Sequence, residues 1–468
     1  MRSEPLGGCG HTSKRSNAAI VTFTWAVYAR RSVKAALAFP RLPDSRDFRK
    51  VWIASIISQL GDWSARLAIG ILIFDRTGSA VYVGTAALIF IAPYFGFGQI
   101  LTAWAERFQR RTVMVNCDAL RGAAFVALAL LDPPLPIFFA ILFISASADP
   151  VFEANVSATI VESVDTTQYD AAIRLRHLSL QAATLGGLGL GGLLVGWFDA
   201  RQVLLADALT FAFSALILGR ITARRHAAGE SPSIRETFMG GIDFLRRDQT
   251  SRNAVLATML TIAAGMSVQA QSPVLGKELA DLEPQMIGVL AMLAPAGSIF
   301  AITVVSTAGS DRRLYYRNLV VSIGAAAVAA VLIGLSSRPV ALFIAFFTLG
   351  FVYQTSMTSN IIVGKRIPSD RRAVVFGMLQ ALIIISNGAG AWLGGLFIEL
   401  FGPGRGAQVG LAMAGLAALA VIPRATTRVA AAPHGYTTRR GEQLTIDLSD
   451  HSSMARTSPL TQTSMGDS

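Results

Sequence analysis

The chain has 468 residues, of which 52% are hydrophobic and only 15% are charged, and its net charge is +12. A soluble domain carries about 25% charged residues, and a single core stops growing at roughly 250–300 residues. These values exclude an ordinary soluble protein. They do not indicate nucleic-acid binding either, because the Lys and Arg residues lie between apolar runs rather than on one face.

The apolar runs predict an all-α polytopic membrane protein. Residues 1–50 are basic, and we expect a cytoplasmic extension. Twelve runs of the roughly 20 residues that a membrane-spanning helix needs follow it. A polar linker, 222–252, separates six runs from six, and residues 423–468 have the composition of a disordered cytoplasmic tail. We therefore predict two six-helix bundles, 51–221 and 253–422. The predicted spans are 51–74, 80–103, 112–131, 135–158, 171–196, 201–221, 253–275, 285–308, 317–336, 339–363, 373–401 and 405–422.

The positive charges predict the orientation. With both termini inside, cytoplasmic segments hold 34 of the 41 Lys and Arg residues, and external loops hold five. Such a bias fixes topology in multi-pass proteins of the bacterial inner membrane. We therefore expect both termini in the cytoplasm of a bacterium.

The sequence carries no sign of a metal site, a disulfide framework or an enzyme. Its two cysteines, Cys9 and Cys117, and its five histidines are scattered. The chain lacks an ATP-binding loop and the commonest membrane hydrolase patterns. We expect no cofactor and an ion gradient, rather than ATP, as the energy source.

Three short patterns recur in the second half of the chain at an offset of 203–205 residues. Recurrence in the same order indicates duplication of a six-helix unit. The matched segments are Glu106-Arg107 with Asp311-Arg312-Arg313, Asn155 with Asn360, and Gly187, Gly191 and Gly192 with Gly390, Gly394 and Gly395.

The segment after the second span identifies a family resemblance. It reads Thr102-Ala-Trp-Ala-Glu106-Arg107-Phe-Gln-Arg110-Arg111. This is similar to Gly-x-x-x-Asp-Arg-x-Gly-Arg-Arg, the loop pattern of major facilitator transporters, with Thr102, Glu106 and Gln109 in place of Gly, Asp and Gly. Between about Asp47 and Pro423 the chain resembles the drug and siderophore exporter branch, which includes enterobactin-exporter-like and macrolide-efflux-like proteins.

That resemblance implies export by alternating access, in which two halves rock around a midplane site. Residues 187–192 are similar to the antiporter motif Gly-Pro-x-x-Gly-Gly but lack its proline. The six repeated glycines, Gly187, Gly191, Gly192, Gly390, Gly394 and Gly395, are expected to let helices pack closely.

Asp62, Arg66 and Asp149 are the candidates for proton coupling, because a charge inside a span costs about 2.5–3.5 kcal/mol and normally has a purpose. Asp62 lies eleven residues beyond Val51, about 16 Å deep. A buried carboxyl group binds a proton more readily than one in water. The alternative is a structural Asp62–Arg66 pair, four residues apart on one helix face.

We favour structural roles for the other intramembrane charges. Asp118 and Arg121 lie three residues apart, on a span that the resemblance places at the periphery. Asp207 is expected near the outer end of its span.

The charged segments that close spans two and eight are predicted to form a conformational latch between helix ends. Its alternative is an ordinary basic cytoplasmic loop. The latch residues are Glu106, Arg107, Arg110, Arg111, Asp311, Arg312 and Arg313.

Few charges lie in the spans of the second half, which favours an apolar or amphipathic substrate. The candidates for the substrate cavity are Tyr94, Gln269, Gln271, Gln354, Gln380 and Asn387.

The sequence thus predicts a secondary transporter that exports a small amphipathic molecule, such as a drug, siderophore or secondary metabolite, in exchange for protons. Two alternatives remain: an importer of a nutrient or siderophore, and a non-transporting sensor or scaffold on the same fold. The expected partners are a small-molecule substrate and the lipid bilayer, without nucleic acid, and we expect a monomer.

Overall fold

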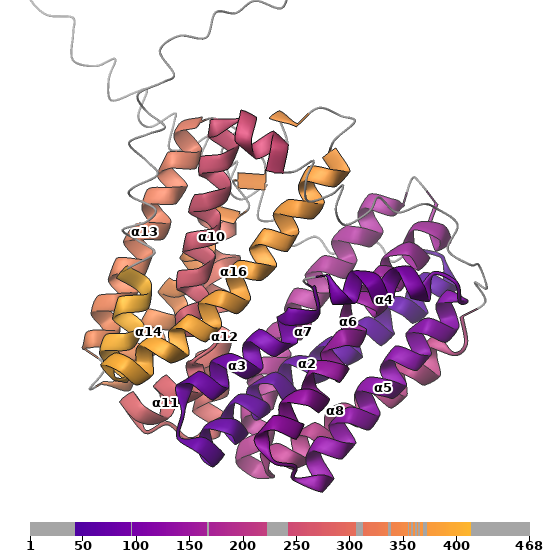
Figure 1. Ribbon diagram of the computed structural model, residues 1–468, viewed down its shortest axis with the longest axis horizontal. Helices are drawn as coiled ribbons and strands as arrows, with labels where there is room; N and C mark the ends of the chain where they lie inside the picture. Colours follow the sequence, from indigo (N-terminus) through magenta and orange to yellow (C-terminus); the bar gives the residue numbers. More distant parts are fainter. Residues whose placement is uncertain are drawn as a thin grey trace, which may run out of the picture. The chain divides into compact units, whose positions relative to one another are not determined.

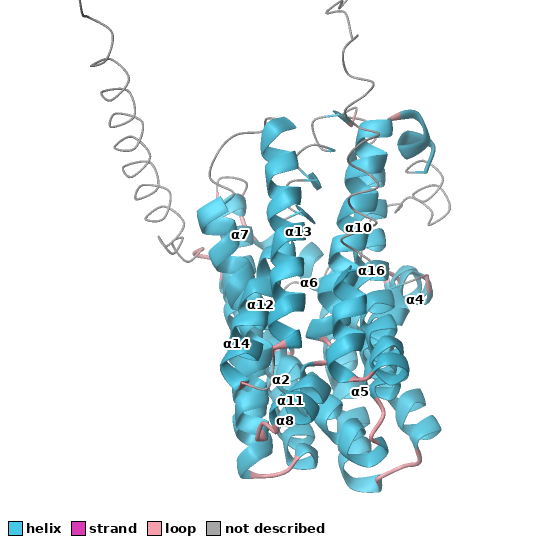
Figure 2. Ribbon diagram, turned by 90° about the vertical axis from the view of Figure 1, so that its left-hand side faces the viewer, coloured by secondary structure: helices cyan, strands magenta, loops and turns pink. Residues whose placement is uncertain are grey.

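The computed structural model describes residues 43–94, 96–165, 168–221, 242–305, 312–335, 338–353 and 372–412, with a few residues between 355 and 367. In this part of the chain all regular elements are helices (Figure 2). By length and apolar composition, eight of them could cross a membrane, or ten if each of two bent pairs is one span. The prediction of an all-α membrane protein is confirmed, whereas the number twelve is not reached within the described residues.

The N-terminal half begins with a well-capped helix. Ser45 accepts a hydrogen bond from the backbone N–H of Phe48, and Gly78, in the left-handed region at φ 61°, ends the helix. The elements are α2 (Arg46–Thr77), α3 (Ala80–Ile91), η1 (Ala92–Tyr94), α4 (Phe97–Ala105), α5 (Arg110–Leu131), α6 (Leu135–Ser163), α7 (Tyr169–Trp197) and α8 (Ala200–Leu218).

The C-terminal half begins at Asp248, whose carboxylate accepts from the backbone N–H of Ser251. The same carboxylate binds Arg366 at 2.8 Å. Although burial favours its neutral form, the hydrogen bonds from Arg366 and Ser251 lower the pKa of Asp248. The elements are α10 (Gln249–Gln269), α11 (Ser272–Ala280), α12 (Pro284–Val305), α13 (Arg312–Gly334), α14 (Pro339–Leu349), η2 (Gly350–Tyr353) and α16 (Arg372–Phe401).

Several spans differ from the expected continuous helices. The span expected at 80–103 breaks near Pro93 and Gly96, where φ is +114°, a conformation that favours glycine. The span expected at 253–275 bends by 51° between α10 and α11. Pro273 stands in the first turn of α11, where its missing N–H is harmless.

The ends of the expected spans also shift. Helix α2 starts at Arg46, five residues before the expected Val51. The span expected at 339–363 is described as α14 and η2, with only scattered residues beyond Tyr353. In the span expected at 405–422, residues 403–412 are helical and the rest lies outside the described residues. So do residues 1–42 and 423–468 and most of the expected linker.

The two halves use the same helix pairings. Helix α7 packs on α2 within the first half, and α16 packs on α10 within the second. Across the halves, α7 packs on α12 and α3 on α16, which lie side by side in Figure 1. Each of these pairings therefore has a counterpart in the other half, as duplication of a helical unit predicts.

Glycines stand at these contacts and follow the same symmetry. A Cβ atom on Gly187 would lie 2.6 Å from the Leu60 carbonyl of α2, and one on Gly390 would lie 2.3 Å from the Ala263 carbonyl of α10. Such distances leave no room for a side chain, so these helices meet backbone to backbone.

The remaining repeated glycines complete the pattern. Gly191 meets the backbone of Ser64 in α2, and Gly394 meets that of Ser267 in α10. Gly192 and Gly395 lie between the halves. Their nearest neighbours are Gly288 of α12 and Ala80 of α3.

Polar contacts join the halves where α2 ends and α3 begins, the end expected to face outward and called the outer end below. Lys277 of α11 binds Asp75 of α2. Glu399 of α16 accepts hydrogen bonds from the Ser79 hydroxyl and the Val81 backbone N–H, at the start of α3. The outer end is therefore closed by backbone packing and by polar contacts.

Gly192→Ala is expected to destabilise the protein, since the new Cβ would lie 2.5 Å from Gly288 Cα and 2.7 Å from the Pro284 carbonyl oxygen. Overpacking of this kind costs about 1–3 kcal/mol. Thermal unfolding in detergent would measure it. The matched control is Gly324→Ala in α13, where a Cβ has no neighbour within 4 Å. Equal melting temperatures for the two variants would contradict the close α7–α12 contact.

Candidate functional site

A buried guanidinium organises the charged residues of the N-terminal half. Arg121 of α5 binds Asp149 of α6 at 2.9 Å and Asp118 of its own helix at 2.5 Å, and it lies 3.6 Å from Asp62 of α2. Arg121, Asp118 and Asp149 are each at most 9% exposed. The side chain also stacks on Phe152, with the guanidinium carbon 4.5 Å from the ring centre. Arg121 thus holds three spans together.

Two further charged residues adjoin these groups. Arg66 of α2 lies 3.4 Å from the Asp149 carboxylate. Asp207 of α8 is 1% exposed, accepts a hydrogen bond from Thr210 at 2.8 Å, and is close enough to Asp62 to interact electrostatically. Gly61 makes this approach possible, because a Cβ there would lie 2.1 Å from the Asp207 oxygen. We call the six residues Asp62, Arg66, Asp118, Arg121, Asp149 and Asp207 the charge cluster.

The charge cluster contains two more carboxyl groups than guanidinium groups. Excess charge is costly in a medium of low dielectric, where the group neutralises instead. Among the described residues, the second oxygen of Asp207 has no hydrogen-bond partner. The cluster is therefore chemically suited to hold at least one proton.

A polar cavity of about 330 Å³ reaches the charge cluster. Asp62 and Asp149 lie in its wall beside Ser58, Gln59 and His177. Hydroxyl, amide and imidazole groups can hydrogen-bond to water or relay protons. The cavity thus offers a polar route to the carboxylates.

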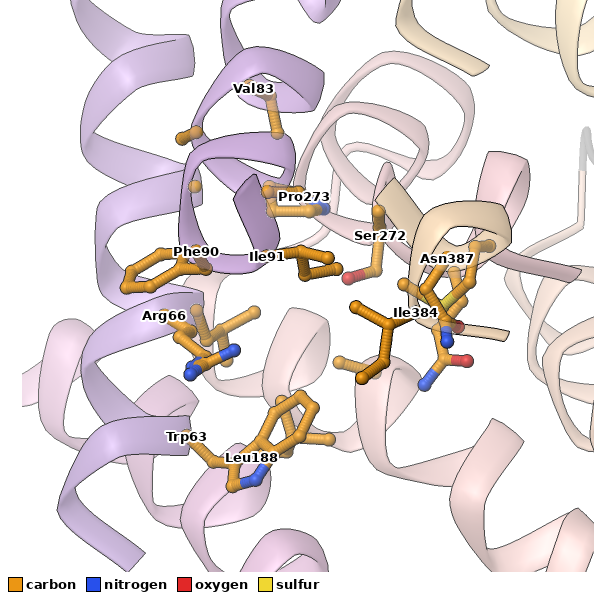
Figure 3. Close-up of a pocket in the computed structure, with 18 of the residues that line it drawn as sticks. Trp63, Arg66, Val83, Phe90, Ile91, Leu188, Ser272, Pro273, Ile384 and Asn387 are labelled. Carbon is orange, nitrogen blue, oxygen red and sulfur yellow. The ribbon is translucent and has the colours of Figure 1, made fainter. Parts of the chain in front are cut away.

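A second cavity, of about 450 Å³, lies between the halves (Figure 3). Its wall is mostly apolar. The first half supplies Phe90 and Ile91, and the second half supplies Pro273, Ile384 and Asn387. Apolar cavities of this size with a few polar groups are typical of small-molecule sites.

The two cavities share part of one wall. Trp63, Arg66 and Tyr94 line both of them. The Arg66 guanidinium carbon lies 4.4 Å from the centre of the Phe90 ring and 5.3 Å from that of Trp63. Arg66 therefore touches the charge cluster on one side and the apolar cavity on the other.

The substrate-cavity candidates separate into two groups. Tyr94, Gln269 and Asn387 line the apolar cavity. Gln271 lies elsewhere: it is fully buried and donates hydrogen bonds to the carbonyls of Ala80 and Ala391, which joins α3 to α16. Gln380 is exposed, and Gln354 lies outside the described residues.

The latch candidates are only partly described. Arg110 binds Glu162 of α6 at 2.6 Å, a contact within the first half. Arg107 is exposed, Arg111 is half-buried, and Glu106 ends α4. Asp311 and the side chains of Arg312 and Arg313 lie outside the described residues, so the expected partner segment is not seen.

Arg121 and Asp207 interact with more charged residues in the structure than the sequence analysis predicted. The expected Asp118–Arg121 pair is present, but the same guanidinium also reaches Asp62 and Asp149. The alternative of an Asp62–Arg66 pair differs from the contacts seen: Asp62 lies beside Arg121, and Arg66 lies beside Asp149. The excess of acidic residues in the first six spans could have predicted these contacts, because a buried charge without a partner on its own helix must pair with a residue on another helix.

The comparisons with known proteins agree with this architecture. A sequence model of the Major Facilitator Superfamily matches residues 51–363. The uncharacterized MFS-type transporter YfiS of Bacillus subtilis is 21% identical over 78% of this chain and 89% of its own length. The staphyloferrin A transporter of Staphylococcus aureus is 19% identical over 54% and 64%.

Two more similarities are informative. Macrolide efflux protein A of Streptococcus pyogenes is 26% identical, over 21% of this chain and 25% of its own. Among solved structures, the nucleoside transporter NupG superimposes with a TM-score of 0.64 at 13% identity, covering 81% of this chain and 99% of that one. At this identity the structural likeness shows the fold alone.

Arg121→Met is expected to lower stability by about 3–5 kcal/mol, because it leaves buried carboxylates without their cation. Thermal unfolding of the purified protein would measure this. Adding Asp118→Asn should recover part of the loss, since it removes one of the stranded charges. A single variant as stable as wild type, or a double variant with strictly additive losses, would argue against the charge cluster as described.

Proposed function

Since the chain belongs to the major facilitator superfamily, it is a membrane transporter rather than an enzyme, and we propose that it exports a small amphipathic molecule in exchange for protons. Protons would bind at Asp62 or Asp149. Substrate would occupy the apolar cavity between the halves. Alternating access would expose that cavity to one side of the membrane at a time.

The observation that carries the proposal is the excess of carboxyl groups in the charge cluster. Arg66 and Arg121 can balance two of the four aspartates, and Asp62 and Asp149 line the polar cavity, which water would fill. Of the four, these two line that cavity, which makes them the residues best suited to exchange protons. Asp118 and Asp207 would keep structural roles.

The apolar cavity supports the substrate assignment. It is bounded by both halves, so relative movement of the halves would change its walls and its exposure. Aromatic and aliphatic side chains dominate, with Gln269, Asn387 and Tyr94 as the polar contacts. This composition suits a molecule with a large apolar body and a few hydrogen-bonding groups.

The outer end supports alternating access. Gly192 and Gly395 close it by backbone contact, and Lys277–Asp75 adds an ion pair. The substrate would leave through this end after the halves separate there. The segments around Glu106 and Asp311 would act as the latch at the opposite end.

Export is favoured over import by the similarity to macrolide efflux protein A. A proton that crosses inward gains about 2.3 kcal/mol per 100 mV of membrane potential. For one-to-one exchange with an uncharged substrate, that supports a concentration ratio of about 50-fold per 100 mV. The monomeric state and the absence of nucleic-acid partners remain predictions.

The test is dye accumulation in an efflux-deficient bacterial host with and without a protonophore. Cells that express the wild type should accumulate less dye than cells with empty vector, and the protonophore should remove the difference. At least one of Asp62→Asn and Asp149→Asn should abolish export at matched membrane levels, because an amide at the coupling position cannot carry the proton. Asp199→Asn, at an exposed position before α8, is the matched control.

Other outcomes would revise specific parts of the proposal. Higher accumulation than in control cells would identify an importer. Export that withstands the protonophore would exclude proton coupling. Full activity of both variants would exclude Asp62 and Asp149 as the coupling residues. An unchanged dye level across a broad panel would favour the non-transporting alternative.

A further inference from the structure

Arg66 lies at the boundary between the polar and the apolar cavity and lines both of them. Its guanidinium makes a 3.4 Å contact with Asp149, which is long for a charge-assisted hydrogen bond. Among the described residues, its Nε atom, which is shielded from solvent, has no hydrogen-bond partner. The same group stacks 4.4 Å from the Phe90 ring centre. Arg66 is thus held incompletely by the carboxylate and lies on an aromatic surface.

That aromatic surface is part of the apolar cavity. Phe90 and Trp63 line it from the first half, and Arg66 points in between them (Figure 3). Aromatic faces attract a cation, and they equally attract a flat apolar molecule by stacking. The Arg66 guanidinium and such a molecule cannot both cover the same face of Phe90.

In the structure Arg66 touches the Asp149 carboxylate and the Phe90 ring at once, with a long contact to the carboxylate. We propose that it moves fully to Asp149 in one state and fully over the Phe90 face in the other, and that the substrate is an uncharged molecule with an aromatic or other flat ring that takes the Phe90 face when Arg66 leaves it. This rests on the proposed proton-coupled transport and specifies its coupling residue and its substrate class. The competition occurs at one ring, so no long-range pathway is needed.

The charges around Asp149 determine the sign of the coupling. Its carboxylate is faced by titratable and charged groups on α2, α5, α6, α7 and η1, and Glu153 is itself paired with Arg176 at 2.6 Å. Those groups are Asp62 and Arg66 of α2, Asp118 and Arg121 of α5, Tyr94 of η1, and, along the polar cavity, Glu153 and His177. A proton on Asp62 or Asp149 removes one negative charge and weakens the attraction on Arg66.

When the cluster is protonated, Arg66 covers Phe90 and excludes the substrate. When the proton leaves, the ionised carboxylate draws Arg66 toward Asp149 and uncovers the ring. Proton and substrate therefore exclude one another, which is the thermodynamic requirement of exchange in opposite directions. The proton arrives from outside, bonds to a carboxylate oxygen, and departs inside, with no other bond changed.

An anionic substrate would reverse this relation. Its negative group would bind Arg66 directly and leave Asp149 with Arg121 as its remaining cation, which favours a proton on the carboxylate, so proton and substrate would bind together. The two possibilities can be separated with a pair of dyes that share one skeleton. N-phenyl-1-naphthylamine is uncharged, and 1-anilinonaphthalene-8-sulfonate carries an added sulfonate.

The experiment measures binding of each dye to the purified full-length protein by fluorescence, on the alkaline and acid sides of neutrality. For the wild type, affinity for the uncharged dye should fall by about 5- to 150-fold on acidification, the usual range for coupled sites. Arg66→Gln should bind that dye at both pH values with the affinity of the alkaline wild type. Phe90→Leu should bind it weakly at both.

Controls keep fold and site effects apart. Arg247→Gln, at an exposed arginine paired with Asp243, should retain the wild-type pH dependence. Melting temperatures of all variants would identify a misfolded one, and Arg66→Lys provides a second test because it keeps the charge but loses the planar stacking group. It should show a reduced pH dependence.

Three results would overturn the inference: pH-independent binding of the uncharged dye, an unchanged pH dependence in Arg66→Gln, or tighter binding of the sulfonated dye on acidification that Arg66→Gln removes. Each is distinct from failure of the proposed function. Proton-driven dye export with pH-independent binding would refute the Arg66 competition and leave the transporter assignment intact. Dye binding that depends on pH and on Arg66, in a protein that does not export the dye, would support the Arg66 competition and refute the proposed export.

Discussion

The cost of charge in a membrane interior is the constraint on which the N-terminal half depends. Arg121 meets it by bridging carboxylates from α2, α5 and α6 with one planar group. Removal of any carboxylate would change the balance for the others, because they share this cation. The packing of the three helices and the protonation of the cluster therefore depend on the same electrostatic interactions. A site of this kind can respond to a proton without a separate sensor.

In the second half, buried polar contacts between helices are made by uncharged groups. Thr258 and Thr261 of α10 bind the hydroxyls of Ser359 and Thr355 at 2.5 and 2.6 Å. Hydroxyl pairs of this type satisfy buried polar atoms without adding charge. The glycine contacts, by contrast, are nearly the same in both halves. Gly187 and Gly191 of α7 pack against α2, and Gly390 and Gly394 of α16 pack against α10 in the same way. Backbone packing thus follows the duplication, whereas the chemistry of the two halves has diverged.

Much of this architecture could be predicted from the sequence, because a span is a local feature that composition alone reveals. Helices α5, α6 and α12 begin within two residues of their expected starts. The break at Gly96 and the bend before Pro273 were not predicted, since an apolar run continues through both. The contacts among the site residues were harder to predict than the spans. Asp62 and Asp149 stand out as charges in spans, but only the packing of α2, α5 and α6 shows that Arg121 joins them. The location of Gln271 inside a helix junction, away from the cavity, likewise depends on tertiary packing.

That glutamine has a consequence for the energetics of the transport cycle. Gln271 shares its amide group between the carbonyls of Ala80 and Ala391, in a position without solvent access. Opening the outer end would separate these groups, and each carbonyl would then need water as a partner. Unlike the more exposed Lys277–Asp75 pair, which dissolved ions screen, such neutral hydrogen bonds hardly feel ionic strength. Saline surroundings would therefore weaken the ion pair of the outer end but leave the contribution of Gln271 to its closure unchanged.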